Sequence, residues 1–160
     1  MAGRIVAVCL SDRKGIQKTA APRGLLVEDR GLEGDAHAGP GERQVSLLAE
    51  EDIDGMRLRA GLDLPPGAFG ENLVTRGIDL LAVPVGGVLR VGPDAVLVVT
   101  RHGKVCHDHC AIYEAAGDCI MPRRGVFARV LEGGEVRPGD RLERVGGEGG
   151  ESASSRLGDR

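Results

Sequence analysis

The stretch KVCHDHC, residues 104–110, brings thiol and imidazole side chains close together along the chain: Cys106, His107, His109 and Cys110. Thiolate and imidazole groups bind soft metal ions, and they also act as nucleophile and as acid or base in covalent chemistry. The stretch alone therefore does not decide between a metal site, a nucleophile with its acid or base partner, and a polar connection between two core elements.

The four cysteines of the chain fall into two groups. Cys9 lies in the apolar run RIVAVCL, so we expect a buried core residue. The N-terminus has too short an apolar run and no small-residue cleavage pattern to be a signal peptide, so we expect a cytoplasmic protein with reduced thiols. Cys106, Cys110 and Cys119 are then the candidates for chemistry.

A structural zinc site is one hypothesis for this cluster. Zinc needs four ligands, which could come from Cys106, His107, His109, Cys110 and Cys119. The spacing argues against it, because common zinc modules use two separated C-x2-C pairs and this cluster has a single C-x3-C pair.

A reactive thiol at Cys106 is the competing hypothesis. Nearby cations, imidazoles and a helix N-terminus all lower the pKa of a thiol, and Cys106 has Arg101 and Lys104 before it and His107 after it. Cys110 lies four residues later and would share a helix face with Cys106, so it could resolve a persulfide there as a disulfide.

The elements that must position these residues are mostly short strands. With 160 residues the chain fits one domain, and its 26 glycines suggest many tight turns. Segments rich in β-branched residues recur between Gly or Pro turns: RIVAVCL, GLLVEDRGLEG, RQVSLL, ENLVTRG, VGGVLRVG, AVLVVTRHG, GVFARVL and GDRLERV. This pattern predicts a mainly β fold, a barrel or a sandwich.

Two segments depart from the strand pattern and predict short helices. Residues 49–61 have Ile53 and Met56 at helical spacing, with acidic residues first and Gly61 as a stop. Residues 107–117 predict a second helix that begins next to Cys106. Residues 146–160 have linker composition, so we expect a domain over 1–145 followed by a disordered tail or the remnant of a connection to another domain.

Charge and hydropathy argue against two classes of partner. The net charge is -3, and there is neither a Lys/Arg block nor an aromatic stacking series, so we expect no nucleic-acid partner. No apolar stretch approaches the length of a membrane span, so we expect no membrane partner.

Several segments, taken together and in order, resemble the MOSC domain, the family named for the C-terminal domain of molybdenum cofactor sulfurase. They are GLEGDAHAGPGERQVSLLAEEDI, GAFGENLVTRGIDL, VGGVLRVGPDAVLVVT, a following Cys, and GVFARVLEGGEVRPGD. The resemblance implies a MOSC-type β-barrel with a few short helices, binding of the molybdenum cofactor (molybdopterin), and a Cys that carries sulfur as a persulfide or ligates molybdenum.

The functional Cys of the family falls on Cys106 in this chain. Family members commonly have Arg-x-Pro-Cys there, whereas this chain has Gly103 and Val105 at the Arg and Pro positions. Arg101 and Lys104 remain nearby as substitutes for the missing cation. Cys110 and Cys119 are additions to the commoner pattern.

Other polar residues in the matching segments are candidates for binding the cofactor. Arg43 precedes a predicted strand and carries a planar guanidinium suited to the cofactor's phosphate. Asn72 is a candidate contact for a pterin or substrate. His37 is another candidate for binding the cofactor. Asp35 would orient the His37 side chain or cap a turn.

These observations predict a protein that binds the molybdenum cofactor, or receives sulfane sulfur on Cys106 for a molybdenum or tungsten centre. The expected partners are a cysteine desulfurase, which carries the pyridoxal phosphate, and a molybdoenzyme or cofactor-biosynthesis protein. One alternative is a molybdenum-dependent reductase of N-hydroxylated compounds in which Cys106 ligates the metal. Another is a non-catalytic module held together by zinc.

Overall fold

The computed structural model describes residues 1–103 and 120–145. The helix predicted over 107–117 and the tail predicted over 146–160 lie outside the described residues.

The described strands follow the predicted segments closely. They are β1 (Ala2–Leu10), β2 (Thr19–Ala21), β3 (Gly24–Val27), β4 (Gly31–Leu32), β5 (Val45–Ala49), β6 (Leu73–Arg76), β7 (Val88–Val91), β8 (Ala95–His102), β9 (Val126–Glu132), β10 (Gly134–Val136) and β11 (Arg141–Arg144). The prediction of a mainly β protein is confirmed.

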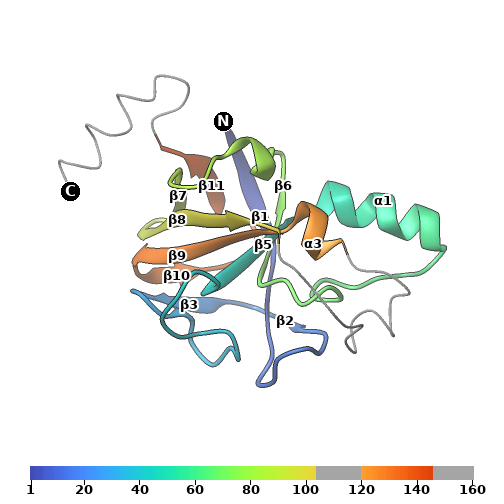
Figure 1. Cartoon of the computed structure of the whole chain (residues 1–160), viewed down its shortest axis with the longest axis horizontal. Helices are drawn as coiled ribbons and strands as arrows, with labels where there is room; N and C mark the ends of the chain where they lie inside the picture. Colours follow the sequence, from blue (N-terminus) through green and yellow to red (C-terminus); the bar gives the residue numbers. More distant parts are fainter. Residues whose placement is uncertain (104–119, 146–160) are drawn as a thin grey trace.

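The main sheet closes into a barrel (Figure 1). Its strand order is β11-β7-β8-β9-β5-β6-β1-β2, and β11 also pairs with β1, so seven strands form a closed ring and β2 extends from β1. Pairing around the ring is antiparallel except between β5 and β6, which run parallel. Closure leaves few unpaired strand edges.

A helix makes the connection that the parallel pair requires, because parallel neighbours cannot be joined by a tight turn. Helix α1 (Glu50–Ala60) begins directly after β5 and lies outside the barrel wall (Figure 1). Gly61 ends it in the left-handed conformation, with φ of 67°, and donates its N–H to the Arg57 carbonyl. The predicted helix over 49–61 is confirmed.

Two short helical segments and a small second sheet complete the described structure. They are η1 (Leu80–Ala82), α3 (Met121–Arg124) and a sheet of order β10-β3-β4. Strands β2 and β10 were not predicted, since three residues are too few to display an alternating pattern. No helix among the described residues is long and apolar enough to cross a membrane.

The barrel wall separates two hydrophobic cores. Along β5, Val45 and Leu47 belong to the core inside the barrel, whereas Leu48 belongs to a second core outside the wall. The outer core packs α1 and α3 onto the barrel and includes Phe69. Cys9 lies in this outer core with no exposed surface, which confirms the prediction of a buried residue.

Candidate functional site

A row of side chains crosses neighbouring strands on the barrel wall. Phe127 on β9 pairs in register with Ser46 on β5 and with Arg101 on β8. Hydrogen bonds continue the row from Ser46 to Asn72, the residue just before β6, and from Asn72 to Cys9 on β1. Residues far apart in the sequence therefore share one level of the barrel.

Asn72 joins three strands at this level. Its side-chain oxygen accepts hydrogen bonds from the backbone N–H of Ser46 at 3.0 Å and from the Ser46 hydroxyl at 3.2 Å. Its side-chain nitrogen donates to the Cys9 carbonyl at 3.0 Å. Asn72 is fully buried, and these contacts are internal to the fold. Its predicted contact with a pterin stays a prediction.

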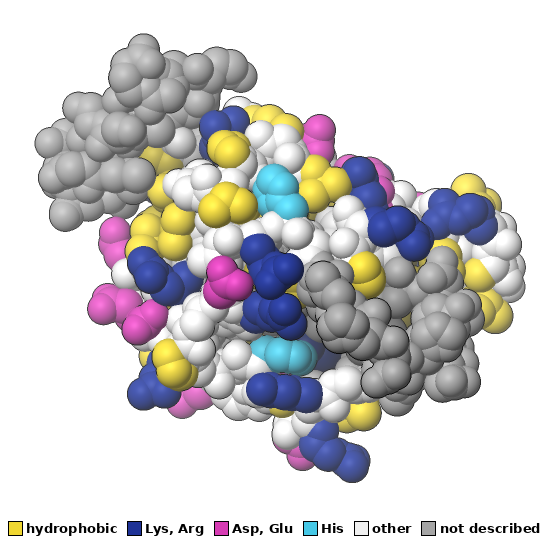
Figure 2. Space-filling model, viewed as in Figure 1, with side chains coloured by type: hydrophobic (Ala, Val, Ile, Leu, Met, Phe, Trp, Pro, Cys, Tyr) yellow, Lys and Arg dark blue, Asp and Glu magenta, His cyan; other side chains and the backbone are white. Residues whose placement is uncertain are grey.

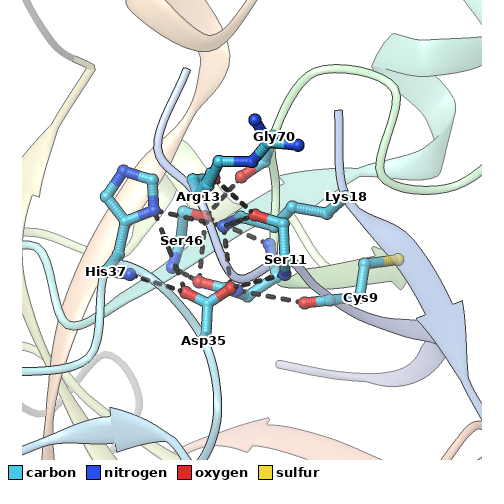
Figure 3. A network of polar contacts seen from close by, with 9 residues as sticks. Cys9, Ser11, Arg13, Lys18, Asp35, His37, Ser46 and Gly70 are labelled. Atoms are coloured by element: carbon cyan, nitrogen blue, oxygen red, sulfur yellow. Dashed lines mark hydrogen bonds and ion pairs between the residues drawn. The ribbon is translucent and has the colours of Figure 1, made fainter. Parts of the chain in front are cut away.

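A buried polar cluster adjoins this row (Figure 3). Lys18, just before β2, extends its ammonium to Asp35 Oδ1 at 2.8 Å, His37 Nδ1 at 3.1 Å and Ser11 Oγ at 3.3 Å. The side chains of Lys18 and Asp35 are 1% and 0% exposed, so this ion pair is almost completely removed from water. A charge at such a depth is stable only when it is paired and hydrogen-bonded.

Asp35 receives hydrogen bonds on both carboxylate oxygens. Its Oδ1 accepts from the Ser11 backbone N–H at 3.0 Å, and its Oδ2 accepts from the His37 backbone N–H at 3.1 Å. Burial by itself would raise the pKa of this carboxyl. The hydrogen bonds and the charge of Lys18 outweigh burial, so the pKa of Asp35 lies below its ordinary value.

His37 lies at the outer edge of the cluster, with its side chain 32% exposed. Its Nδ1 faces Lys18, and the other ring nitrogen points away from Lys18 and Asp35 (Figure 3). The structure therefore places His37 and Asp35 together. Asp35 fixes the His37 backbone directly, as expected of a turn cap.

Arg43 lies over the outer face of the barrel. Its guanidinium carbon is 5.8 Å from the centroid of the Phe127 ring, a distance at which a cation is attracted to an aromatic face. Arg43 is exposed, and none of the described carboxylates forms an ion pair with it. A guanidinium held in this way is available to an anion.

Arg101 is more constrained than Arg43. Its Nη1 lies 3.5 Å from Glu42 Oε1, and its Nε donates to the Gly103 carbonyl at 3.0 Å. Thr100 on the same strand donates its hydroxyl to the Glu42 carbonyl. Arg101 therefore connects the loop that carries Arg43 to the turn that leads toward Cys106.

Gly103 explains one departure from the family pattern. Its φ is +67°, and a Cβ at this position would overlap the Pro122 carbonyl oxygen. Its N–H donates to the Gly125 carbonyl at 2.6 Å, which joins the end of β8 to the start of β9. The arginine common in the family cannot occupy this position in this conformation.

The remaining predicted site residues lie outside the described residues: Lys104, Cys106, His107, His109, Cys110 and Cys119. Both hypotheses for the cysteine cluster depend on them. Within 1–103 and 120–145, no group of three or more His, Cys, Asp or Glu side chains could hold a metal ion.

Sequence reasoning missed Lys18 and Ser11, although both contact Asp35. A lysine between two short polar stretches carries no sequence signal of burial, and only the fold shows its partners.

The sequence also left open the role of Glu71. Its carboxylate accepts the N–H groups of Gly67 at 2.8 Å and Phe69 at 3.0 Å. Burial raises the pKa of this carboxyl despite those bonds.

The face shown in Figure 2 carries Lys and Arg side chains in a column, with His side chains above and below them. Asp and Glu side chains lie mainly to the left of this column in the same view, and the chain as a whole has a net charge of -3. The column of cations, and not the whole face, would attract anionic ligands.

Comparison with known proteins assigns the fold to a family. The model of the MOSC domain matches residues 33–143, a range that contains Asp35, His37, Arg43, Asn72 and Arg101. The chain belongs to the MOSC domain family. The match includes strands β5, β6, β8 and β9 of the row described above and the segment that contains Cys106, whereas β1 lies before it.

Solved structures share the MOSC fold of this chain at low sequence identity. The YuaD protein of Bacillus subtilis has a TM-score of 0.71 and 20% identity, over 89% of this chain and 94% of that one. YiiM of Geobacillus stearothermophilus has a TM-score of 0.69 and 22% identity, over 92% and 77%. YiiM of Escherichia coli has a TM-score of 0.65 and 21% identity, over 91% and 70%. Among curated proteins, none matches.

Proposed function

We propose that this MOSC protein binds a molybdenum-cofactor-type ligand on the face that carries Arg43, and receives sulfane sulfur on Cys106 for delivery to a molybdenum or tungsten centre. The observation that carries the proposal is the guanidinium of Arg43, exposed over the Phe127 ring and without an ion pair to any described carboxylate. Phe127 pairs in register with Arg101, near the end of the strand that leads to the Cys106 segment.

The described residues fit the phosphate of such a cofactor. A guanidinium offers parallel N–H donors that match two phosphate oxygens, and its positive charge persists at every physiological pH. Arg43 would hold the phosphate, while Arg101, through its contact with Glu42, would hold the loop in place. When bound, the cofactor would supply the metal centre at which sulfur or substrate chemistry takes place.

Sulfur loading needs only the thiol of this chain and a donor. The Cys106 thiolate attacks the terminal sulfur of a persulfide on the donor, a new S–S bond forms, and the donor cysteine leaves as a thiolate. No net oxidation is required, since the sulfane sulfur passes from one thiol to another. His107 and Lys104 are neighbours in sequence that would favour the thiolate form of Cys106.

The proposed partners follow from this chemistry. A cysteine desulfurase with its own pyridoxal phosphate would supply the sulfane sulfur, and a molybdoenzyme or cofactor-biosynthesis protein would receive the product. The thiol must stay reduced between cycles, which suits a cytoplasmic location.

The decisive experiment loads the protein with sulfur. After incubation with a cysteine desulfurase and cysteine, intact-protein mass spectrometry should detect the gain of one sulfur atom, removed by a thiol reductant. Cys106→Ser should abolish the gain, whereas Cys9→Ser, at a buried thiol, should retain it. Loading that persists in Cys106→Ser would contradict the proposal.

Elemental analysis of the protein purified from its native host separates the alternatives. Molybdenum or tungsten with a pterin supports the proposed ligand. A retained metal with turnover of N-hydroxylated compounds and no sulfur loading would indicate the reductase instead. Stoichiometric zinc that protects Cys106, Cys110 and Cys119 from alkylation would favour the structural-metal alternative.

A further inference from the structure

The hydrogen bonds of the buried cluster can be assigned a direction from their donors and acceptors. A charged lysine has three N–H donors and no acceptor. Lys18 has three described neighbours within hydrogen-bond distance: Asp35 Oδ1, Ser11 Oγ and His37 Nδ1. Each of the three N–H groups of Lys18 therefore has one acceptor, and none of them is left without a partner.

The Ser11 hydroxyl supports this assignment. It donates its own hydrogen to the Arg13 carbonyl at 2.8 Å, so its lone pairs are available to Lys18. Asp35 is an acceptor on both oxygens, which is consistent with an ionised carboxylate. Its negative charge lies 2.8 Å from the Lys18 ammonium, and the two groups are buried together as an ion pair.

His37 must then accept a hydrogen bond at Nδ1. A neutral imidazole carries one proton, so an Nδ1 that accepts leaves that proton on Nε2. Asp35 does not compete for Nδ1, because its nearer oxygen Oδ2 is 3.8 Å away, too far for a hydrogen bond.

We infer that Lys18 is a positioning residue that fixes the proton of neutral His37 on Nε2, so that His37 meets a ligand as an N–H donor and not as a base. The tautomer follows from the contact between Lys18 Nζ and His37 Nδ1. The ligand toward which His37 donates rests on the proposed function.

A proton on Nε2 limits the chemistry that His37 can perform. In this tautomer the Nδ1 lone pair faces Lys18, and Nε2 has no lone pair in the ring plane, so accepting a proton would require breaking the bond to Lys18. An imidazole N–H suits an anionic oxygen acceptor such as a phosphate. His37 would therefore contribute orientation of the ligand, and proton abstraction would fall to another group.

The test is nitrogen NMR of the full chain labelled with 15N-histidine, at mildly alkaline pH and without ligand. The chain has four histidines, so His37→Asn identifies the resonances of His37 by their loss. The wild type should give an unprotonated, hydrogen-bonded Nδ1 and a protonated Nε2. A proton on Nδ1, or on both nitrogens, overturns the inference.

The variants test whether Lys18 is the cause. Lys18→Met alone would leave the Asp35 carboxylate buried without a cation, so the Lys18→Met/Asp35→Asn variant removes both charges together. In this variant the two ring-nitrogen resonances should move toward each other as the Nδ1–H tautomer becomes populated. Ser11→Ala, which retains the Lys18–His37 bond, should leave them unchanged. Unchanged resonances in the double variant overturn the inference.

The outcome of this experiment does not depend on the proposed function, because the experiment uses neither cofactor nor sulfur donor. A wild-type spectrum as expected, combined with no sulfur loading and no bound pterin, would reject the proposed function and retain the role of Lys18. The opposite combination would reject the role of Lys18 alone.

Discussion

Asn72 and Ser46 are 26 residues apart in sequence and bonded through both backbone and side chain. The Asn72 backbone N–H donates to the Ser46 carbonyl at 3.0 Å, and its side-chain oxygen accepts the Ser46 N–H at the same distance. This pair starts the parallel alignment of β5 and β6, which continues as Leu47 opposite Leu73. The side-chain oxygen of Asn72 thus accepts the Ser46 N–H in place of a backbone carbonyl of a neighbouring strand.

Asn72→Ala should therefore destabilise the barrel. It leaves the Ser46 N–H and the Cys9 carbonyl buried without the partners that they have now, and each such loss costs about 1–3 kcal/mol. We expect the free energy of unfolding, measured with urea, to fall by at least ~2 kcal/mol. Ser46→Ala, which keeps both backbone groups paired, should cost less. Equal stability of Asn72→Ala and the wild type would contradict this role.

The buried Asp35 carboxylate predicts a dependence of stability on pH. The pKa of Asp35 lies below its ordinary value, because hydrogen bonds and Lys18 outweigh burial. Ionised Asp35 thus stabilises the fold fully above the unfolded pKa, about 3.9, and this contribution is lost as the pH falls through the lower folded pKa. Asp35→Asn should cost ~3–5 kcal/mol at neutral pH, since Lys18 is left unpaired.

Urea unfolding across a pH series checks this expectation. The difference between the wild type and Asp35→Asn should shrink below about pH 4, where wild-type Asp35 begins to bind a proton on unfolding. The exposed Asp63→Asn should match the wild type throughout. A difference that stays constant down to the acid transition would show that the charge of Asp35 does not stabilise the fold.

The fold was largely predictable because its signals are local. The short segment RQVSLL, one of those between Gly or Pro turns, predicts the strand that became β5, and the Gly61 stop predicts the end of α1. The closure of the barrel is not local: it depends on pairing between β1 and β11, at opposite ends of the described chain. The resemblance to the MOSC domain predicted a barrel, whereas the local sequence pattern left a barrel and a sandwich as alternatives.

The candidate site was predictable only in part, because its geometry depends on distant segments. Asp35 and His37 were identified from a short motif, and they do lie together. The lysine that joins them comes from another segment, and nothing in its sequence neighbours indicates that it is buried. The geometry at Gly103 depends on its approach to Pro122, which only the packing of α3 against the end of β8 defines.

Cys9 should be chemically inert in the folded protein. Burial, followed by the negative charge of Glu71, raises the pKa of its thiol to about 12, although Lys18 acts in the opposite direction. The reactive thiolate is therefore negligible at mildly alkaline pH. Peptide mass mapping should find Cys9 unmodified after iodoacetamide treatment of the native protein and modified after treatment in urea. Rapid native labelling of Cys9 would contradict its burial.

Arg43→Lys should weaken cofactor binding without unfolding the protein. Lysine keeps the charge but loses the planar pair of donors, so we expect roughly a tenfold loss of affinity, equivalent to ~1.4 kcal/mol. The measurement is the molybdenum and pterin retained per protein after purification. Arg141→Lys on β11, an exposed arginine paired with Glu143, is the matched control and should retain wild-type amounts. Equal retention in Arg43→Lys would remove Arg43 from the proposed site.

The last prediction separates two effects at Gly103, the residue before the Cys106 segment. Gly103 and Gly15 have similar backbone conformations, with φ of 67° and 77°, but a Cβ on Gly15 would meet nothing within 4 Å. Gly15→Ala should cost only the left-handed conformation of a residue with a Cβ, roughly 1–2 kcal/mol. Gly103→Ala carries the same cost plus an overlap with the Pro122 carbonyl, and overpacking adds ~1–3 kcal/mol.

Urea unfolding of the two variants should therefore rank Gly103→Ala well below Gly15→Ala in stability. Gly103→Arg, which restores the arginine common in the family, should be destabilised at least as much as Gly103→Ala, because its Cβ meets the same carbonyl. Equal costs at the two glycines would mean that the turn moves away from Pro122 easily. A stable Gly103→Arg variant with faster sulfur loading would show that this chain can adopt the family's arrangement, in which the cation precedes the cysteine directly.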